Sequence, residues 1–350
     1  MRVLENVPLR ELTTLAVGGP ARYLIEARVE DDVPRAAGFG AEKGLPVFVL
    51  GGGSNVLVAD EGFDGVVVRI ALAGCEIPAG PGAPCVVRAA AGEDWDALVA
   101  RCVERGLGGI ECLSGIPGTV GATPIQNVGA YGQEVAGTIV SVRAFDRLSG
   151  AVRRLTPAEC AFGYRTSVFN TTERDRYIVL DVSFALTPGA APTLLYGELS
   201  ARFEGVRPSL GAVREAVRDI RRGKGMLLVA GDPDCRSAGS FFKNPVLSEV
   251  TYRALIEAAG TGMPSYEAGE GKVKVSAAWL VENAGYKKGM ALGGAGLSTR
   301  HSLALINRGH AAARDLFDLA RGIRRTVRAR FGVLLEPEPV LLGFEQSLDS

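Results

Sequence analysis

The sequence predicts a protein of mixed helix and strand structure, either α/β or α+β, built in three parts. Strand-like and helix-like segments follow one another along all 350 residues, without an internal repeat or a low-complexity tract. Hydrophobic residues make up 47% of the chain and charged residues 22%, which suits a globular protein with a sizeable core. The character of the sequence changes near residues 70 and 215, so we place the boundaries between the parts there.

The first part predicts strands around one helix. Residues 21–27 form a strand candidate, and Asp31 and Asp32 place negative charge where a helix N-terminus favours it. Gly44 marks the end of that helix. Short apolar runs predict the remaining strands of this part, at residues 46–50, 56–58 and 66–70.

The second part predicts a helix between strands, followed by a hairpin. Residues 93–105 have a helical period, because one face carries the apolar side chains of Trp95, Leu98, Val99, Cys102 and Val103. Ser149 and Gly150 lie between two strand-like runs and predict the hairpin turn. The strands expected here are residues 85–90, 140–145, 152–155 and 177–186, and an Ala/Pro-rich loop follows at 188–192.

The third part is mainly helical. Val213, Val217 and Ile220 share one helical face, and a basic run overlaps its end, comprising Arg218, Arg221, Arg222 and Lys224. Further helices are predicted at residues 252–259, 277–284 and 313–331. Residues 333–342 are expected to close the chain as a strand. Pro337 and Pro339 interrupt it, which predicts a position at a sheet edge.

Charge and cysteine content exclude several classes of protein. Acidic and basic residues are equal at 39 each, which argues against a nucleic-acid binder or a protein bound to anionic membranes. The six cysteines form no CxxC pair and only two histidines are present, so we expect no metal site. No run of about 18 apolar residues and no N-terminal hydrophobic segment is found. We therefore expect a cytoplasmic protein with buried, reduced thiols.

The first glycine-rich segment, Gly51 to Gly53, follows an apolar strand. Bare backbone N–H groups there can approach a phosphate closely. A Rossmann dinucleotide loop needs a third glycine and then a helix, whereas Val56 occupies that position and β-branched residues follow. The Rossmann interpretation therefore fails, and a different nucleotide loop or a plain turn remains.

A second glycine-rich segment, residues 115–132, contains five glycines and several polar residues but no regular period. Segments of this length without regular structure are usually functional or disordered, and the apolar residues in this one argue against disorder. Backbone amides wrapped around a flat polar ring would explain the composition. A buried Ω-like loop without a ligand is the alternative.

Five strings occur in a fixed order along the chain: VLGGGSNVLVAD (49–60), SGIPGTVGATPIQNVGAYGQE (114–134), GYRTSVF (163–169), GSFFKNP (239–245) and LEPEPVLLG (335–343). Together they resemble the family of UDP-N-acetylenolpyruvoylglucosamine reductases, also called UDP-N-acetylmuramate dehydrogenases, over residues 12–343. The PIQN form of the second string and the stretch around Tyr196 resemble the first type of that family, which carries an extra loop over the substrate site.

The resemblance implies an α+β, three-domain flavoprotein of the vanillyl-alcohol-oxidase/PCMH-type FAD-binding class, not a Rossmann fold. It divides the chain into two parts of an FAD-binding domain (1–70 and 71–214), a substrate-binding domain (215–332) and a C-terminal strand carrying a catalytic glutamate (333–350). The implied reaction is NADPH-dependent reduction of UDP-N-acetylglucosamine enolpyruvate to UDP-N-acetylmuramate through FAD, in peptidoglycan precursor synthesis. The expected partners are these small molecules, with no nucleic acid, no membrane and no second subunit.

The resemblance also implies roles for particular residues. Ser240 matches the proton donor, and Arg165 and Glu338 match the pair that stabilises the intermediate. The residues implied to hold FAD are Gly51, Gly52, Gly53, Ser54, Asn55, Ser114, Gly115, Ile116, Pro117, Gly118, Gly121, Ala122, Gln126, Asn127, Gly129, Ala130 and Tyr131, with Gln126 and Asn127 near the flavin ring. The implied substrate contacts are Tyr164, Tyr196, Lys224, Asn244, Tyr266 and Lys274.

These residue types suit the implied chemistry. Hydride addition to an enolpyruvyl group drives negative charge toward its carboxylate, and Arg165 can bind that group through two parallel hydrogen bonds. Ser240 precedes Phe241 and Phe242, whose side chains would help to exclude water. An ionised Glu338 would repel the intermediate, so we expect it to be protonated or tightly hydrogen-bonded. After Lys224 the chain runs GMLLVAGDPDCRSAG, whereas we expected a shorter and more polar approach to Ser240.

Two rival functions remain at this point. An alcohol oxidase of the same fold often tethers FAD covalently through histidine or tyrosine, but both histidines lie in the C-terminal part, away from the flavin loops in sequence. A flavoprotein fold kept only for binding nucleotide sugars would be expected to lose Ser240, Arg165 or Glu338, and all three are present.

Overall fold

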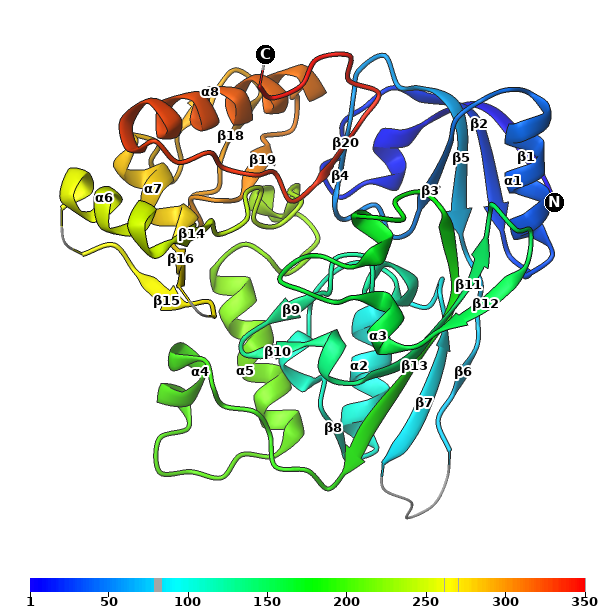
Figure 1. The fold of residues 1–350 in the computed structure, drawn as a ribbon, viewed down its shortest axis with the longest axis horizontal. Helices are drawn as coiled ribbons and strands as arrows, with labels where there is room; N and C mark the ends of the chain where they lie inside the picture. The colour runs from blue at the N-terminus through cyan, green and yellow to red at the C-terminus, as the bar shows by residue number, and fades with distance from the viewer. Residues whose placement is uncertain (79–83, 261, 270, 350) are drawn as a thin grey trace. The chain divides into compact units, whose positions relative to one another are not determined.

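The computed structural model describes residues 1–78, 84–260, 262–269 and 271–349 and divides the chain into two compact units (Figure 1). Unit 1 is made of Met1–Val7, Ala21–Gly53 and Asp64–Arg222. Unit 2 is made of Pro8–Pro20, Ser54–Phe63 and Gly223–Ser350. Both units are therefore discontinuous in sequence. The finer division at residues 70, 214 and 332 stays a prediction.

Unit 1 begins with a four-stranded sheet. Its strands lie in the order β1 (Val3–Pro8), β2 (Pro20–Ala27), β5 (Phe63–Ile70) and β3 (Val47–Leu50). The helix α1 (Asp32–Glu42) follows β2, and the Asp32 carboxylate accepts the backbone N–H groups of Arg28 and Val29 at 3.1 and 3.2 Å. β3 and β5 pair in parallel. The strand–helix–strand order expected for this part is confirmed.

The larger sheet of unit 1 is antiparallel along its main path. Its strands lie in the order β12 (Val152–Leu155), β11 (Ile139–Asp146), β13 (Tyr177–Pro188), β7 (Cys85–Ala90) and β6 (Cys75–Glu76), and β8 (Leu107–Gly108) pairs with the end of β13. The hairpin between β11 and β12 turns at Ser149 and Gly150, as predicted. The helix α2 (Trp95–Glu104) presents its predicted apolar face to this sheet, with the rings of Trp95 and Phe184 5.7 Å apart.

Unit 1 ends with helical segments. α3 (Pro157–Cys160) and α4 (Gly197–Arg202) are short, and α5 (Leu210–Gly223) is long. The apolar face of α5 is buried as predicted, in a cluster that contains Cys112, Leu199, Val213, Ala216, Val217 and Ile220.

The described residues of unit 2 form three small sheets and three α-helices. β4 (Val56–Val58) pairs in parallel with β20 (Val340–Leu342). The other two sheets contain β14 (Val246–Ser248), β16 (Lys272–Val275) and β15 (Ser265–Glu267), and then β17 (Ala291–Leu292), β18 (Ala295–Leu297) and β19 (Leu305–Asn307). The helices are α6 (Glu249–Ala259), α7 (Ala277–Asn283) and α8 (Ala313–Phe331). Phe241, Phe242 and Phe317 lie in the core of this unit.

The strand expected at residues 333–342 is shorter in the structure, so the predicted extent is wrong. Only Val340–Leu342 forms a strand, because Pro337 and Pro339 cannot donate to a ladder. β20 pairs with β4 alone among the described strands, so the predicted edge position is confirmed. The short strands β9 (Gly129–Ala130) and β10 (Gln133–Glu134) pair with each other in unit 1. Like β6, β8 and β14 to β19, they were not predicted, because runs of two to four residues carry too little periodicity.

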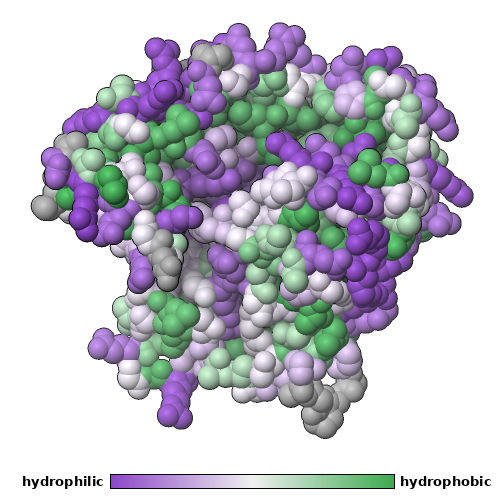
Figure 2. Space-filling view, viewed as in Figure 1, coloured by the Kyte–Doolittle hydropathy of each residue, from purple (hydrophilic) through white to green (hydrophobic). Residues whose placement is uncertain are grey.

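The surface and the described side chains add two observations. Hydrophilic and hydrophobic residues are interspersed over the face seen in Figure 2. Within the described ranges, no helix is long and apolar enough to cross a bilayer, and no group of three His, Cys, Asp or Glu side chains is arranged to hold a metal ion.

Candidate functional site

The two glycine-rich segments of unit 1 meet at backbone distance. A Cβ atom on Gly51 would lie 2.7 Å from Thr119 Oγ1, and one on Gly52 would lie 2.7 Å from the Cα atom of Gly118. Gly53 has a φ of +64°, a left-handed backbone conformation that is strained for a residue with a side chain. These glycines are therefore required by the close approach of two loops. Thr119 Oγ1 is buried and has no hydrogen-bond partner among the described residues, so it marks a polar position that a ligand would satisfy.

The second glycine-rich segment is fixed by backbone hydrogen bonds to its surroundings in unit 1. Trp95 N–H donates to the Gly118 carbonyl at 3.1 Å, and Gly121 N–H donates to the Ala91 carbonyl at 2.9 Å. A Cβ on Gly121 would lie 2.5 Å from the Cβ of Ala91, so only glycine fits. The segment is thus an ordered loop rather than a disordered one, as its apolar residues predicted.

Gly115, at the start of this loop, is held from both sides. The Asp96 carboxylate accepts the Gly115 N–H at 2.6 Å, and Arg221 Nε donates to the Gly115 carbonyl at 2.9 Å. Arg214 and Arg218 also donate to Asp96. Burial opposes ionisation of Asp96, but these hydrogen bonds and charges outweigh it and lower its pKa. Arg221 is only 8% exposed. It therefore supports the loop through Gly115 and is not part of a solvated helix end.

Asn127 is 1% exposed and is occupied within the loop itself. Its amide group donates to Glu134 Oε2 at 2.8 Å and to the Gly163 carbonyl at 3.0 Å, and its Oδ1 atom accepts the Ala136 N–H at 3.1 Å. The φ of Asn127 is +46°, a conformation that Asn tolerates better than most residues. Its implied role near a flavin ring stays a prediction. In the structure, its three hydrogen bonds stabilise the conformation of the loop.

Arg165 lies in a tight turn. Gly163 and Thr166 exchange backbone hydrogen bonds of 3.0 and 3.2 Å, and Arg165 between them has a φ of +55°. Arg165 Nη2 donates to the Gly129 carbonyl at 2.6 Å. Ser167 Oγ donates to the Ile125 carbonyl at 2.6 Å and so ties the turn to the glycine-rich loop. The turn therefore presents a permanent cation beside that loop.

The two tyrosines implied for cofactor and substrate also meet in unit 1. The rings of Tyr131 and Tyr196 are 5.2 Å apart and nearly perpendicular. Tyr196 immediately precedes α4 and is 40% exposed. An exposed aromatic ring held edge-on by another is suited to contact a ligand.

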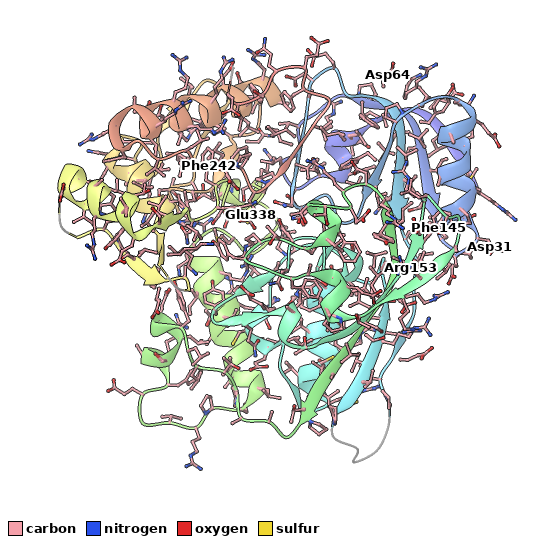
Figure 3. All side chains as sticks on the ribbon, in the orientation of Figure 1. Asp31, Asp64, Phe145, Arg153, Phe242 and Glu338 are labelled. Atoms are coloured by element: carbon pink, nitrogen blue, oxygen red, sulfur yellow. The ribbon has the colours of Figure 1, made fainter. Side chains whose placement is uncertain are left out.

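In unit 2, backbone hydrogen bonds join the segments that carry Ser240 and Glu338. Glu338 N–H donates to the carbonyl of Phe241, the residue after Ser240, at 2.8 Å. Asn55 Nδ2 donates to the Glu338 carbonyl at 3.1 Å. Figure 3 labels Phe242 and Glu338 in this region, and the Phe241 and Phe242 side chains are each only 1% exposed. The apolar neighbours expected for Ser240 are therefore buried beside it.

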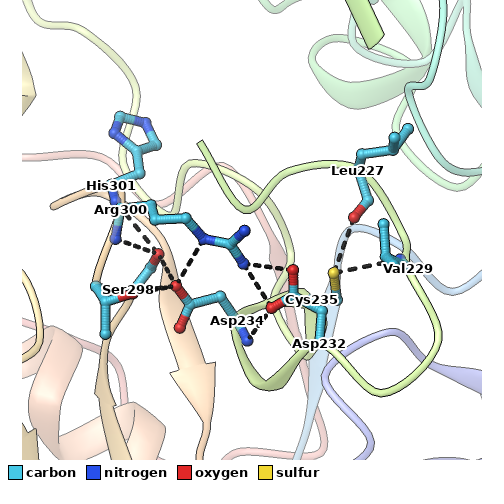
Figure 4. Close-up of polar contacts among 9 residues, drawn as sticks. Leu227, Val229, Asp232, Asp234, Cys235, Ser298, Arg300 and His301 are labelled. Atoms are coloured by element: carbon cyan, nitrogen blue, oxygen red, sulfur yellow. Dashed lines mark hydrogen bonds and ion pairs between the residues drawn. The ribbon is translucent and has the colours of Figure 1, made fainter. Parts of the chain in front are cut away.

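A residue not included among the candidates lies beside Ser240. Ser240 Oγ and His301 Nε2 are 3.3 Å apart. His301 follows a turn in which Arg300 donates to Asp232 and Asp234, and Ser298 donates to Asp234 (Figure 4). The Thr299 hydroxyl also donates to Asp234. By the family resemblance, His301 lies where some members carry a glutamine or a similar polar residue that contacts substrate, and this departure from the pattern kept it from being included as a site.

Two implied substrate contacts pair across the sheet of unit 2. Tyr266 and Lys274 are direct partners on β15 and β16, with the Lys274 ammonium 5.8 Å from the Tyr266 ring centre. Asn244 Oδ1 accepts the Ala277 N–H at 3.0 Å, at the first turn of α7. Lys224 follows α5 directly and lies near enough to His301 to disfavour its protonated form.

The implied residues are thus divided between the units. Unit 1 holds Gly51 to Gly53, the loop 114–132, Tyr164, Arg165 and Tyr196, and unit 2 holds Ser54, Asn55, Lys224, Ser240, Asn244, Tyr266, Lys274 and Glu338. The structure adds Thr119, Ser167 and His301 to the polar residues of interest, none of which was among the predicted site residues. Each of the three is notable for its surroundings in the folded protein, which the local sequence does not report.

The fold can now be compared with known families. A family model described as an FAD binding domain matches residues 21–156, and one described as the C-terminal domain of UDP-N-acetylenolpyruvoylglucosamine reductase matches residues 232–342. The chain is therefore an FAD-binding protein with an α+β fold, and the expectation that it is not a Rossmann protein is confirmed.

Full-length relatives give the particular family. Proteins called UDP-N-acetylenolpyruvoylglucosamine reductase from Thermobifida fusca (strain YX) and Nocardia farcinica (strain IFM 10152) are 47% and 51% identical to this chain. The matches cover 97% of this chain in both cases and 98% and 90% of the relatives. The crystal structure of the enzyme so named from Thermus caldophilus superposes with a TM-score of 0.66 at 29% identity, covering 98% of this chain and 99% of that one. The chain belongs to the UDP-N-acetylenolpyruvoylglucosamine reductase family, and it is a flavoprotein of peptidoglycan synthesis.

Proposed function

We propose that this chain reduces UDP-N-acetylglucosamine enolpyruvate to UDP-N-acetylmuramate, with electrons that pass from NADPH through FAD. Membership of the family supports the reaction. The observation that carries the assignment of residues is the hydrogen bond between Glu338 N–H and the Phe241 carbonyl. That bond holds a carboxyl-bearing residue beside a serine with buried apolar neighbours.

The loops of unit 1 fit FAD. The Gly51 and Gly52 backbone lies against Thr119 and Gly118 with no room for side chains, which leaves bare N–H groups for a pyrophosphate. The buried Thr119 hydroxyl offers a further hydrogen bond. We assign FAD binding to these glycines, to Ser54 and Asn55, and to residues of the loop 114–131 named above. Bound FAD would supply the hydride for the enolpyruvyl double bond.

The residues of the chain would manage charge and protons in that reaction. Arg165 would bind the substrate carboxylate, where negative charge builds. A preorganised donor of this kind contributes about 3–4 kcal/mol to transition-state stability. Ser240 would give its hydroxyl proton to the carbon next to the carboxylate. Glu338, protonated or hydrogen-bonded, would share the charge of the intermediate with Arg165.

The remaining roles concern binding. Tyr164, Tyr196, Lys224, Asn244, Tyr266 and Lys274 would contact the sugar nucleotide, and the lysines suit its pyrophosphate. NADPH would reduce the cofactor, leave, and be followed by the sugar nucleotide. We further propose a monomer located in the cytoplasm.

Purified holoprotein tests the assignment. NADPH oxidation is followed with and without UDP-N-acetylglucosamine enolpyruvate, for wild type, Ser240→Ala and the control Ser149→Ala, which makes the same change at the exposed hairpin turn. We expect oxidation to depend on the sugar nucleotide, and Ser240→Ala to lose turnover while NADPH still reduces its flavin. A protein that binds FAD but ignores this substrate would refute the proposed reaction. Full turnover by Ser240→Ala would refute only the role of Ser240.

A further inference from the structure

The contact between Ser240 and His301 rests on two segments that are locked together. Phe241 N–H donates to the Leu303 carbonyl at 2.8 Å, and Ala304 N–H donates to the His301 carbonyl at 3.1 Å. The first bond follows Ser240 by one residue, and the second closes the turn that carries His301. These bonds fix the backbone that carries both side chains, whose Ser240 Oγ and His301 Nε2 atoms lie 3.3 Å apart.

The turn before His301 is itself fixed by a buried carboxylate. Asp234 is 2% exposed, and its Oδ2 atom accepts the Ser298 hydroxyl at 2.9 Å and the Arg300 Nε–H at 3.1 Å. The Ser298 hydroxyl oxygen in turn accepts the backbone N–H groups of Arg300 and His301 at 3.0 and 3.2 Å. The Arg300 side chain is thus turned toward the aspartates in Figure 4, and the imidazole of His301 points elsewhere.

The charge state of His301 follows from its surroundings. Burial is the main cause that lowers its pKa, to about 4, and the positive charges of Lys224 and Lys288 lower it further. The ring is therefore neutral at physiological pH, with one nitrogen as donor and the other as acceptor. Only the tautomer with the proton on Nε2 can donate to Ser240 Oγ.

We propose that His301 is a positioning residue for Ser240: neutral, with Nε2–H donating to Ser240 Oγ, it leaves the serine hydroxyl hydrogen free to point at the substrate. The proposal rests on the role of Ser240 in the proposed function. In the opposite tautomer the serine would donate its hydrogen to the ring, and that hydrogen would be turned away from the reacting carbon.

The same hydrogen bond would act during proton transfer. The O–H bond of Ser240 breaks as the C–H bond of the product forms, and the negative charge of the enolic intermediate passes to Ser240 Oγ. His301 Nε2–H then donates to an alkoxide instead of a hydroxyl, and such charge-assisted bonds are about twice as strong as neutral ones. The imidazole keeps its own proton, and water returns the serine to its hydroxyl form.

The tautomer can be observed directly, without turnover. The chain has only two histidines, so ¹⁵N-histidine labelling gives few signals, and His310→Gln assigns them. We expect His301 to be neutral and protonated at Nε2 from pH 6 to 9 in the resting holoprotein. A charged ring in this range, or a proton on Nδ1 alone, would overturn the proposal.

Kinetics test the consequence for Ser240. His301→Leu removes the donor, whereas His301→Gln keeps an amide N–H near the Nε2 position and cannot ionise. We expect His301→Leu to slow product formation about 100-fold, as for loss of one donor to a developing oxyanion, while reduction of the flavin by NADPH stays within a few-fold of wild type. His301→Gln should recover most of the rate and keep the pH profile of the wild type. His310→Leu is the matched control.

A double-mutant cycle separates positioning from simple structural support. In a Ser240→Ala background, His301→Leu should cost nothing further, because the two residues act as one unit. Independent costs would mean that His301 does not act through Ser240. If Ser240→Ala itself keeps full turnover, the role of Ser240 has failed and the present proposal with it, while the proposed reaction stands. If Ser240→Ala is inactive and His301→Leu is as fast as wild type, only the present proposal has failed.

Discussion

Arg165 Nη2 donates a hydrogen bond of 2.6 Å to the carbonyl oxygen of Gly129, across 36 residues of sequence. The approach is possible because Gly129 has no side chain: a Cβ there would lie 2.6 Å from Glu134 Cγ, 3.0 Å from the Gln133 carbonyl oxygen and 3.1 Å from Arg165 Nη1. The position of the Arg165 guanidinium therefore depends on residue 129 having no side chain.

Gly129→Ala is therefore expected to displace Arg165 and to destabilise the protein by about 1–3 kcal/mol through overpacking. The melting temperature of the holoprotein and its turnover check this. Gly137→Ala is the matched control, because a Cβ at Gly137 meets nothing within 4 Å and its φ is not positive. Equal effects of the two substitutions would contradict the assigned contact.

Arg165→Lys keeps the charge and removes the two-pronged geometry. If Arg165 binds the carboxylate of the intermediate, kcat should fall about 100-fold, while reduction of the flavin by NADPH should change little. Stopped-flow measurement of the two half-reactions separates these effects. A fall confined to the NADPH half-reaction would place Arg165 elsewhere in the cycle.

Lys274→Gln should weaken binding of the sugar nucleotide without slowing chemistry. Lys274 lies against the Tyr266 ring, and loss of one charged contact to a pyrophosphate should raise KM roughly tenfold with kcat within a few-fold of wild type. Lys272→Gln removes the same charge two residues earlier on β16 and serves as the control. A similar rise in KM for both variants would indicate general electrostatic attraction instead.

Asp234→Asn should lower stability in a pH-dependent way. Burial opposes ionisation of Asp234, but hydrogen bonds from Thr299, Ser298 and Arg300 outweigh it and lower its pKa in the folded state. The stabilisation is fully present above the unfolded pKa of about 4 and is lost as the pH falls below it. The variant should therefore be less stable by roughly 1–3 kcal/mol at pH 7, and the difference should shrink toward pH 3.

Thermal unfolding at several pH values measures this difference. Glu249→Gln, which breaks an exposed pair with Arg253, is the control and should change stability by less than about 0.5 kcal/mol. A difference between Asp234→Asn and wild type that stays constant from pH 7 to pH 3 would mean that the Asp234 carboxylate is not responsible.

The cysteines should be inert in the folded protein. Burial raises the pKa of Cys102, Cys112 and Cys160 to about 12, and Cys85 and Cys235 are also buried. Titration with a thiol reagent at pH 8 should label less than one cysteine rapidly before unfolding and all six in denaturant. Rapid labelling of several thiols in the native protein would contradict the described burial.

Much of the fold could be predicted because the buried face of a helix or strand makes apolar residues recur at a regular spacing in the sequence. The apolar faces of α2 and α5 were visible as side chains three and four positions apart, and both are buried. Very short strands such as β9 and β17 carry no such period. The proline-containing segment before β20 looked apolar enough for a strand, but Pro337 and Pro339 have no N–H to donate to a ladder.

Part of the candidate site could also be predicted from the sequence, and part could not. The glycines of residues 51–53 and 115–132 were recognisable, because close backbone packing excludes other residues. Ser167 and His301 were not, because their contacts join positions 42 and 61 residues apart and need only one polar side chain each. Such single residues are chosen by tertiary structure, and no local pattern reports them.

The pairing of β4 with β20 has a consequence for biosynthesis. Asn55 and Glu338, at the start of that pairing, are 283 residues apart, so unit 2 cannot close its two-stranded sheet until nearly all of its sequence has left the ribosome. During that time the apolar strand Val56–Val58 lacks its partner and is a target for chaperones or for aggregation. The nascent chain must therefore protect one strand while it waits for the other, and slower translation lengthens that interval.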